Sequence, residues 1–416
     1  MKNSSNRRII RLVIALTVLI LFAGCALAGF IFLRHEQRQN DDITNALTIS
    51  KQAKNVLDAI EPDPEYLSLW ECSEKQLGSM FAGTCRLNGF QKLACAQDVS
   101  MLIVGDSIGA QQWPVNVASW MEKNYNVKCT LKNISLGGNV SYSGFTSLYR
   151  LDDACPYDIV IICYGQNDPD LEFAADYEAL LRLVLERYNN CSAISVLESS
   201  QREYTAKMQA IQQIASYYSV PVADTIQAFD KSGLSYESLS GDGVHPNEAG
   251  QDIYAQLIEQ VIADSVAEEA SRRSALLFAA LSDGEAVDFS QYDSSFTLPQ
   301  PLSENVEEYS RFRYYPASAF TRLSGTEWQI QLSGVLGKLG IDKGRCHEYN
   351  DFQVYLNDQE IYSEQDYQTI DYTLRRISRM TYSSLPLDGE LKIHFYSDAC
   401  ADAFYGLVIT DYKESK

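Results

Sequence analysis

The stretch MLIVGDSIGAQQW, residues 101–113, runs four apolar residues directly into Gly105, Asp106 and Ser107. An apolar run without alternation is typical of a strand that is buried on both faces. A helical pattern follows it. Two interpretations are open from this stretch alone. Either Asp106 or Ser107 caps the helix of an ordinary strand-to-helix turn, or Ser107 is a nucleophile presented at the end of a buried strand.

Residues 98–266 repeat this rhythm of buried strand and helix. Strong apolar runs are YDIVIICYG (157–165) and SAISVL (192–197), and weaker ones are VKCTLKNISL (127–136) and SVPVAD (219–224). Helical patterns occupy residues 109–124, 174–188, 203–218 and 247–265. This alternation predicts the α/β class, with a parallel sheet covered by helices on both faces. Ligands bind such sheets at the carboxyl ends of the strands, where Ser107 lies.

The pattern changes after a predicted helical connector at residues 267–287. Tyr and Phe become dense, and apolar and polar residues alternate in DFQVYLND (351–358), GELKIHFYSD (389–398) and FYGLVITDY (404–412). Residues 288–416 are therefore predicted to form an antiparallel β-sandwich. The alternating aromatic residues fit the core of such a domain, and a sugar-binding surface is the other interpretation.

The N-terminus predicts a membrane anchor. Four cations precede an uncharged stretch of 22 residues at positions 12–33: Lys2, Arg7, Arg8 and Arg11. A helix of this length spans the roughly 30 Å hydrocarbon core, and the positive-inside rule favours an internal N-terminus. We expect residues 1–38 to be a cytoplasmic tail and single transmembrane helix in the cell membrane, with the catalytic body extracytoplasmic. The alternatives are a cleaved signal peptide and a lipidated Cys25 in FAGC.

Residues 39–95 are predicted to be a stem and a cysteine-containing lead-in. The chain has ten cysteines and no CxxC pair, so an exported body is expected to carry disulfides. Cys346 and Cys400 are predicted to pair, whereas Cys163 lies in an apolar run and is predicted to be a free core thiol. The net charge of −21 argues against a nucleic-acid partner.

A serine nucleophile needs a base, a group that orients the base, and donors for the oxyanion. The chain has four histidines, and only His245 belongs to the α/β part. Asp242 precedes it by three residues in GDGVHPNEAG, where an irregular turn lets the carboxylate reach Nδ1 of the imidazole. Nε2 then faces outward, toward the hydroxyl of Ser107.

Two further strand ends carry candidate oxyanion donors. NISLGGNVS ends one predicted strand at Gly137 and Gly138, and CYGQNDPD ends the next at Asn167. A glycine lets its N–H approach an oxyanion without a Cβ in the way, and the Asn167 amide adds a side-chain donor. Together with the N–H of Ser107, these groups predict a hole of three donors.

Taken together, these blocks resemble the SGNH hydrolases, also called the GDSL esterase/lipase family, over residues 98–266. The matching blocks are GDSIG with Ser107, NISLGGN with Gly138, GQND with Asn167, and DGVHPNEAG with Asp242 and His245. The resemblance implies a flavodoxin-like three-layer sandwich with five parallel strands at residues 96–266. It implies ester hydrolysis through a Ser107 acyl-enzyme, with His245 as base, Asp242 as its orienting group, and an oxyanion hole of Ser107, Gly138 and Asn167. It implies no metal and no cofactor.

The predicted function is a membrane-anchored, extracytoplasmic serine esterase that removes short acyl groups, acetyl above all, from a glycan. Its partners are an acylated glycan or small ester substrate and the membrane, with no nucleic acid and no prediction of the oligomeric state. Two alternatives remain open. One is an O-acyltransferase with the same catalytic residues, and the other is a non-catalytic, glycan-binding surface protein.

Overall fold

The structure is a computed structural model that describes residues 87–151, 156–188, 191–283, 298–304, 306, 313–344, 352–364, 375–379 and 385–414. The predicted membrane segment at residues 12–33 and most of the predicted stem lie outside these residues. Within the described ranges, no helix is both long and apolar enough to cross a membrane.

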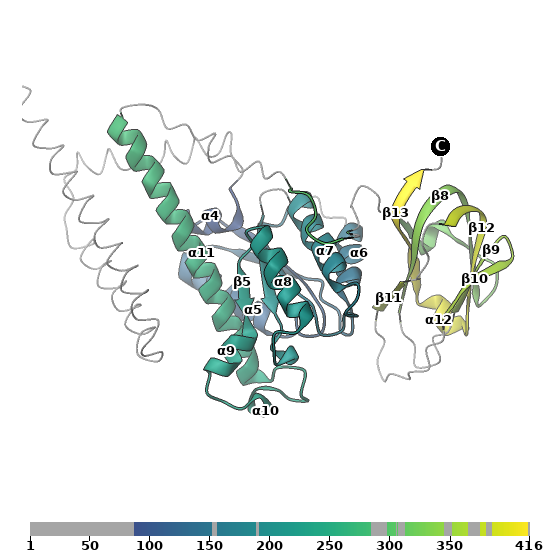
Figure 1. Cartoon of the computed structure of the whole chain (residues 1–416), viewed down its shortest axis with the longest axis horizontal. Coiled ribbons are helices and arrows are strands. Elements are labelled where there is room, and N and C mark those ends of the chain that lie inside the picture. Colours follow the sequence, from purple (N-terminus) through teal and green to yellow (C-terminus); the bar gives the residue numbers. More distant parts are fainter. Residues whose placement is uncertain are drawn as a thin grey trace, which may run out of the picture. The chain divides into compact units, whose positions relative to one another are not determined.

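A parallel sheet of five strands forms the centre of the α/β domain (Figure 1). In the spatial order β2-β1-β3-β4-β5, the strands are β2 (Cys129–Asn133), β1 (Val99–Gly105), β3 (Ile159–Cys163), β4 (Ser192–Leu197) and β5 (Val222–Asp224). Every residue of β3 and β4 is buried, as the non-alternating apolar runs predict. The predicted five-stranded parallel sheet is therefore confirmed.

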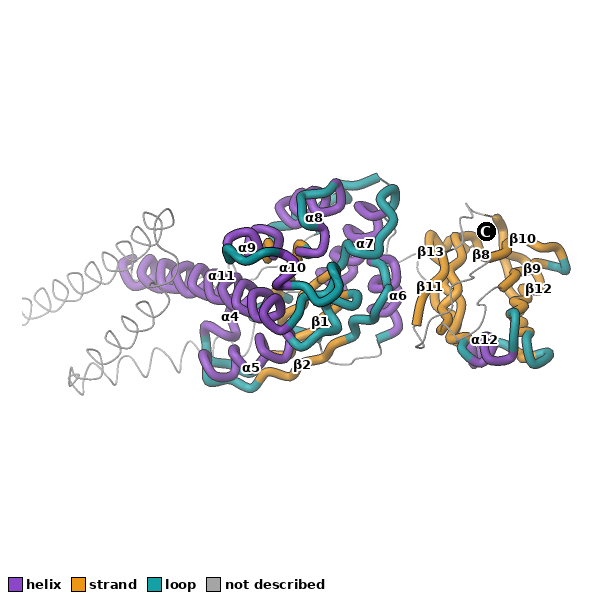
Figure 2. Tube along the Cα trace, turned by 90° about the horizontal axis from the view of Figure 1, so that it is seen from below, coloured by secondary structure: helices purple, strands orange, loops and turns teal. Residues whose placement is uncertain are grey.

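Helices cover both faces of this sheet (Figure 2). One hydrophobic core lies beneath α6 (Ser141–Arg150), α7 (Phe173–Arg187) and α8 (Ala206–Tyr217). A second core lies on the opposite face, beneath α4 (Gly89–Ala94), α5 (Trp113–Tyr125), α9 (Thr225–Lys231) and α11 (Glu248–Asp283). Two short elements, η1 (Ser199–Gln201) and α10 (Tyr236–Leu239), lie in the connections near the carboxyl ends of the strands. The result is the three-layer arrangement that the sequence predicts.

The structure differs from the sequence prediction in several helices: the short helices α4, α9 and α10 were not predicted, and three longer ones differ as follows. α6 was not predicted, because its sequence SYSGFTSLYR is poor in helix formers; Tyr142, Phe145 and Leu148 nevertheless bury one face of it. α5 begins at Trp113, since residues 109–112 form turns. α11 continues without a break to Asp283, so the described part of the predicted connector extends the last helix of the domain. The domain boundaries themselves stay predictions.

The C-terminal strands form one antiparallel, hydrogen-bonded network. Its main path is β10 (Gln359–Glu364), β9 (Phe352–Leu356), β12 (Leu385–Phe395), β8 (Glu327–Gly344), β13 (Phe404–Glu414) and β6 (Arg313–Pro316), and β7 (Thr321–Arg322) and β11 (Arg375–Arg379) also pair with β8. η4 (Ala317–Ala319) and α12 (Asp398–Asp402) complete the described elements. β8 pairs with β12 along its first part and with β13 along its second. The predicted antiparallel pairing is confirmed, whereas the predicted sandwich of two packed sheets stays a prediction.

The aromatic residues of this domain divide between its core and its surface. Phe352, Phe395 and Phe404 are buried and pack against one another. Tyr396 and Tyr405 are exposed.

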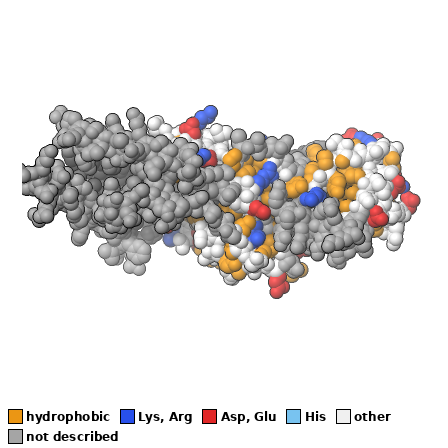
Figure 3. All heavy atoms as spheres, turned by 90° about the horizontal axis from the view of Figure 1, so that it is seen from above, with side chains coloured by type: hydrophobic (Ala, Val, Ile, Leu, Met, Phe, Trp, Pro, Cys, Tyr) orange, Lys and Arg blue, Asp and Glu red, His pale blue; other side chains and the backbone are white. Residues whose placement is uncertain are grey.

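On the face drawn in Figure 3, the described Lys and Arg side chains are scattered rather than gathered into one basic patch.

The cysteine predictions have different outcomes. Cys163 is a buried, unpaired thiol on β3, as predicted. No disulfide joins two of the cysteines that the structure describes. The predicted pair of Cys346 and Cys400 lies outside that part of the chain, because Cys346 is not described.

Candidate active site

The site begins at the tight junction that follows β1. A Cβ on Gly105 would lie 2.7 Å from the carbonyl oxygen of Cys163, so only glycine fits where β1 and β3 approach each other. The next residue, Asp106, donates its N–H to that carbonyl at 3.1 Å. Its Oδ1 accepts the N–H of Ile108 at 2.8 Å, and its side chain is fully buried. The resulting turn presents Ser107 at the carboxyl end of the strand.

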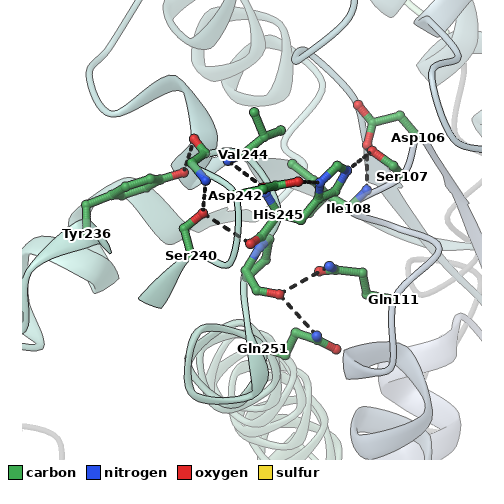
Figure 4. A network of polar contacts seen from close by, with 12 residues as sticks. Asp106, Ser107, Ile108, Gln111, Tyr236, Ser240, Asp242, Val244, His245 and Gln251 are labelled. Atoms are coloured by element: carbon green, nitrogen blue, oxygen red, sulfur yellow. Dashed lines mark hydrogen bonds and ion pairs between the residues drawn. The ribbon is translucent and has the colours of Figure 1, made fainter. Parts of the chain in front are cut away.

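Ser107, His245 and Asp242 form a continuous chain of hydrogen bonds (Figure 4). Nε2 of His245 lies 2.8 Å from Oγ of Ser107, and Nδ1 lies 2.6 Å from Oδ2 of Asp242. A carboxylate can only accept at Nδ1, so Nδ1 carries the proton and Nε2 accepts the Ser107 hydroxyl. This is the arrangement in which a histidine removes a proton from serine.

The Asp242 carboxylate is held ionised by donors on its own loop. The hydrogen bond from the His245 side chain, followed by those from the N–H groups of His245 and Val244, lowers the pKa of Asp242 well below its usual range. The two backbone bonds to Oδ1 are 2.7 and 2.9 Å long. The carboxylate is mostly exposed, so hydrogen bonds, rather than burial, fix its direction.

Ser240 ties the two ends of this loop together. Its hydroxyl donates to the carbonyl of His245 at 3.2 Å and accepts the N–H of Gly243 at 2.9 Å. Gly243 has a φ of +86°, a conformation that favours glycine. The Tyr236 hydroxyl donates to the carbonyl of Gly243 at 3.4 Å (Figure 4). These bonds fix the turn that carries Asp242 and His245.

A second set of bonds joins this loop to the chain that follows Ser107. The carbonyl of Pro246 accepts Nε2 of Gln111 at 3.2 Å and Nε2 of Gln251 at 3.1 Å (Figure 4). Oε1 of Gln251 accepts the N–H of Gln112 at 2.9 Å. Two glutamines therefore couple the position of His245 to that of Ser107, a role that the sequence analysis did not foresee.

The predicted oxyanion donors come from neighbouring loops. After β2, the N–H of Leu136 still pairs with the carbonyl of Gly105, and Gly138 follows in a turn with a φ of +72°. Nδ2 of Asn167 donates to Oδ2 of Asp106 at 3.0 Å and to the carbonyl of Asn139 at 3.2 Å. Asn167 thus bridges the residue before Ser107 and the residue after Gly138. The structure brings together the loops that carry all three donors, and the oxyanion-hole role itself stays a prediction.

Buried acids lie beneath the three loops. Asp168 accepts the N–H and hydroxyl of Ser141 at the start of α6 and is almost fully buried. Glu198 follows β4 directly and is fully buried, and its Oε2 accepts the N–H of Gln166 at 2.7 Å. Burial raises the pKa of Asp106, Asp168 and Glu198. Across the described residues, no three His, Cys, Asp or Glu side chains gather as metal ligands would.

Comparison with known proteins assigns the α/β domain. Residues 103–253 match the sequence model of the GDSL-like Lipase/Acylhydrolase family. The match covers 151 of the 416 residues. The resemblance to the SGNH, or GDSL, hydrolases is therefore confirmed, and the chain is an ester-hydrolysing enzyme of the serine hydrolase type. None of the curated proteins matches the chain significantly.

Solved structures resemble the chain in fold. A two-domain esterase active on acetylated mannans, co-crystallised with mannopentaose, has a TM-score of 0.56 and 16% identity and covers 78% of this chain and 93% of its own. A second structure of such an esterase has a TM-score of 0.55 and 14% identity, with coverages of 78% and 94%. An acetylxylan esterase from Geobacillus stearothermophilus is 24% identical, with a TM-score of 0.34, and covers 39% of this chain and 94% of its own.

The Asp242–His245 bond predicts the effect of Asp242→Asn on ester hydrolysis. An asparagine amide can donate to Nδ1, which favours the tautomer with its proton on Nε2, and this tautomer cannot accept the Ser107 proton. We expect kcat to fall by about 10⁴-fold. Initial rates on p-nitrophenyl acetate measure the effect. Asp230→Asn, the same change at an exposed position of α9, is the control and should retain full activity. An Asp242→Asn enzyme within tenfold of wild type contradicts the assignment.

Proposed function

We propose that the chain is a membrane-anchored serine esterase that removes acetyl groups from a glycan through an acyl-enzyme on Ser107. The observation that carries the catalytic part is the hydrogen-bonded chain from Ser107 through His245 to Asp242. The tautomer that these bonds select leaves Nε2 as the proton acceptor. Each of the three side chains thus has one chemical role.

In the first half of the reaction, Oγ of Ser107 attacks the ester carbonyl carbon while its proton moves to Nε2 of His245. The imidazolium that forms is stabilised by the Asp242 carboxylate at Nδ1. The carbonyl π electrons move to the oxygen, which becomes the oxyanion. The tetrahedral intermediate then collapses, the C–O bond to the sugar breaks, and His245 returns the proton to the departing hydroxyl.

In the second half, water takes the place of the sugar. His245 accepts one of its protons as the water oxygen attacks the acyl carbon, and the intermediate expels Oγ of Ser107, which recovers the proton. The products are the carboxylic acid and the free serine. An acyltransferase would use a sugar hydroxyl in place of this water.

The oxyanion is proposed to accept from the N–H groups of Ser107 and Gly138 and from Nδ2 of Asn167. In the structure, Asn167 already donates to Asp106 and to the carbonyl of Asn139. The bond to Asn139 is the longer of the two, and we propose that it yields to the oxyanion while the bond to Asp106 stays. One such donor typically contributes about 3 kcal/mol of transition-state stabilisation.

The substrate class rests on likeness of fold. The two-domain esterase that covers 78% of this chain is described as active on acetylated mannans. The family model covers only 151 residues, little more than a third of the chain. The structural match to this esterase therefore includes a large part of the chain outside the family model. On this basis, we propose that the substrate is an acetylated polysaccharide, and that Ser107 attacks the carbonyl carbon of its acetyl group.

Membrane anchoring is proposed from the uncharged stretch at residues 12–33 and the four cations before it. An anchored body outside the cytoplasm would meet extracellular polysaccharide directly. Expression of the full chain, followed by alkaline carbonate extraction and intact-mass measurement, tests this. The unprocessed mass in the membrane pellet supports the anchor. A soluble chain, or one that begins at Cys25 with added lipid mass, overturns it.

The chain length of the acyl group gives the test of the esterase proposal. The full chain in detergent should hydrolyse p-nitrophenyl acetate faster than its longer acyl homologues. Ser107→Ala and His245→Ala should each lower kcat by at least about 10⁴-fold. Release of acetate from an acetylated mannan then tests the glycan part.

Two control variants match these substitutions. Ser216→Ala changes an exposed serine of α8, and His394→Ala changes a half-exposed histidine of β12. Both should retain wild-type rates. Turnover that survives in Ser107→Ala would contradict the acyl-enzyme. A folded wild-type chain that hydrolyses no ester, yet transfers acetyl to an added sugar, would favour the acyltransferase.

A further inference from the structure

Glu198 is a buried acid directly beneath the loop that carries Asn167. It follows the last residue of β4, and its side chain is fully buried. Oε2 accepts the N–H of Gln166 at 2.7 Å, and Oε1 accepts the thiol of Cys163 at 3.4 Å. Both donors belong to β3 or the loop after it. The carboxyl group therefore lies against the stretch that positions Asn167.

The chain above Glu198 is packed tightly against it. Gly165 has a φ of +142°, and a Cβ there would lie 2.5 Å from Cε of Met208 and 3.5 Å from Oε2 of Glu198. The positive φ favours glycine here, and a Cβ would crowd the flexible end of Met208, whereas 3.5 Å from Oε2 is an ordinary van der Waals contact. The loop that leads to Asn167 therefore passes directly over the Glu198 carboxyl group.

The carboxyl groups of Glu198 and Asp106 also lie close enough for each to shift the pKa of the other. Two acids in such contact cannot both be ionised in a buried environment, so one proton is held between them. Asp106 accepts two further hydrogen bonds, from the N–H of Ile108 and Nδ2 of Asn167, which favour its ionised form. These two bonds leave Glu198 as the protonated member of the pair, able to donate to Asp106.

We propose that Glu198 is a positioning residue for ester hydrolysis: as a carboxylic acid, it fixes the Asp106 carboxylate, which in turn aims the Asn167 amide at the oxyanion. This proposal rests on the proposed role of Asn167. Asp106 is the link, because its Oδ2 accepts from Asn167 while its Oδ1 holds the turn after Ser107. A shift of Asp106 would disturb both groups.

The surroundings of the pair support a retained proton. Burial raises the pKa of Glu198 well above its ordinary value, and the charge on Asp106 raises it further. The titratable groups that influence the two acids come from every element packed around them: Cys163 on β3, Tyr164 and Asp168 on the loop after it, Tyr177 on α7, Tyr254 on α11, and His245 on the catalytic loop. Lys207 on α8 points its Nζ at the carbonyl of Asp168.

Two substitutions separate the proton from the shape of the side chain. Glu198→Gln keeps a neutral group that can donate to Asp106 and accept from Gln166. Glu198→Met keeps the approximate volume and removes the hydrogen bonds. We expect Glu198→Gln to retain kcat for p-nitrophenyl acetate within about threefold. Glu198→Met should lower kcat by about 10- to 100-fold with KM changed less than threefold, because the donor is misplaced rather than lost.

The pH profile distinguishes this role from a merely structural one. Below its raised pKa, Glu198 keeps its proton and supports Asp106; as the pH rises through that pKa, the acid ionises and two buried charges repel. The wild-type kcat should therefore fall at alkaline pH, whereas Glu198→Gln, which cannot ionise, should lack this fall. A wild type and a Glu198→Gln variant with the same alkaline profile overturn the proposal, even if Glu198→Met fails to fold.

A spectroscopic measurement keeps this test separate from that of the proposed function. The infrared difference spectrum of wild type minus Glu198→Gln at neutral pH should contain the carbonyl stretch of one protonated carboxylic acid. The absence of this band from the difference spectrum overturns the proposal whether or not any ester is turned over. Turnover that survives in Ser107→Ala instead contradicts the acyl-enzyme and leaves the infrared result standing. A Glu198→Met variant with wild-type kcat overturns the positioning role.

Discussion

The buried carboxylate of Asp106 is the constraint on which the site depends. It is fully enclosed, and the N–H of Ile108 and the amide of Asn167 converge on it. A buried carboxylate without hydrogen-bond donors costs several kcal/mol of folding free energy. Moving either loop away would remove a donor, so this cost holds both loops against the carboxylate. The turn that exposes Ser107 and the loop that bears Asn167 therefore take their places together.

The site combines this buried acid with two exposed groups, Asp242 and His245, whose catalytic role we propose. Asp242 and His245 lie on a loop at the surface, where hydrogen bonds within the loop set their orientation. The carbonyl of Pro246, held by two glutamines, links that loop to the chain after Ser107. The position of Ser107 is thus set by the buried Asp106, and the position of the loop that carries His245 is set by hydrogen bonds between uncharged groups. Such fixed positions reduce the reorganisation that the reaction needs.

The sequence predicted those parts of the structure that a single hydrophobic or spacing pattern determines. Buried strands read as apolar runs, and the spacing of Asp242 and His245 indicated the loop that joins them. Helix α6 was not predicted, because its segment has a weak helix propensity. The burial of Phe145 and its neighbours stabilises the helix in spite of this. The role of Glu198 was not predicted, because its partners are distant in sequence. Its position directly after a buried apolar run, like that of Asp106, was a signal that could have been used. The hydrogen bonds of Asn167 required the three-dimensional structure.

The central claim is that the turn fixed by Asp106 presents Ser107 as an activated nucleophile. The most direct measurement is covalent labelling of the full chain in detergent with a fluorophosphonate, followed by peptide mass spectrometry. We predict one adduct per chain, on the peptide that contains Ser107, at a rate that falls sharply when the chain is unfolded. An unlabelled Ser107 in a folded chain, or an adduct on another serine at a similar rate, would contradict the account.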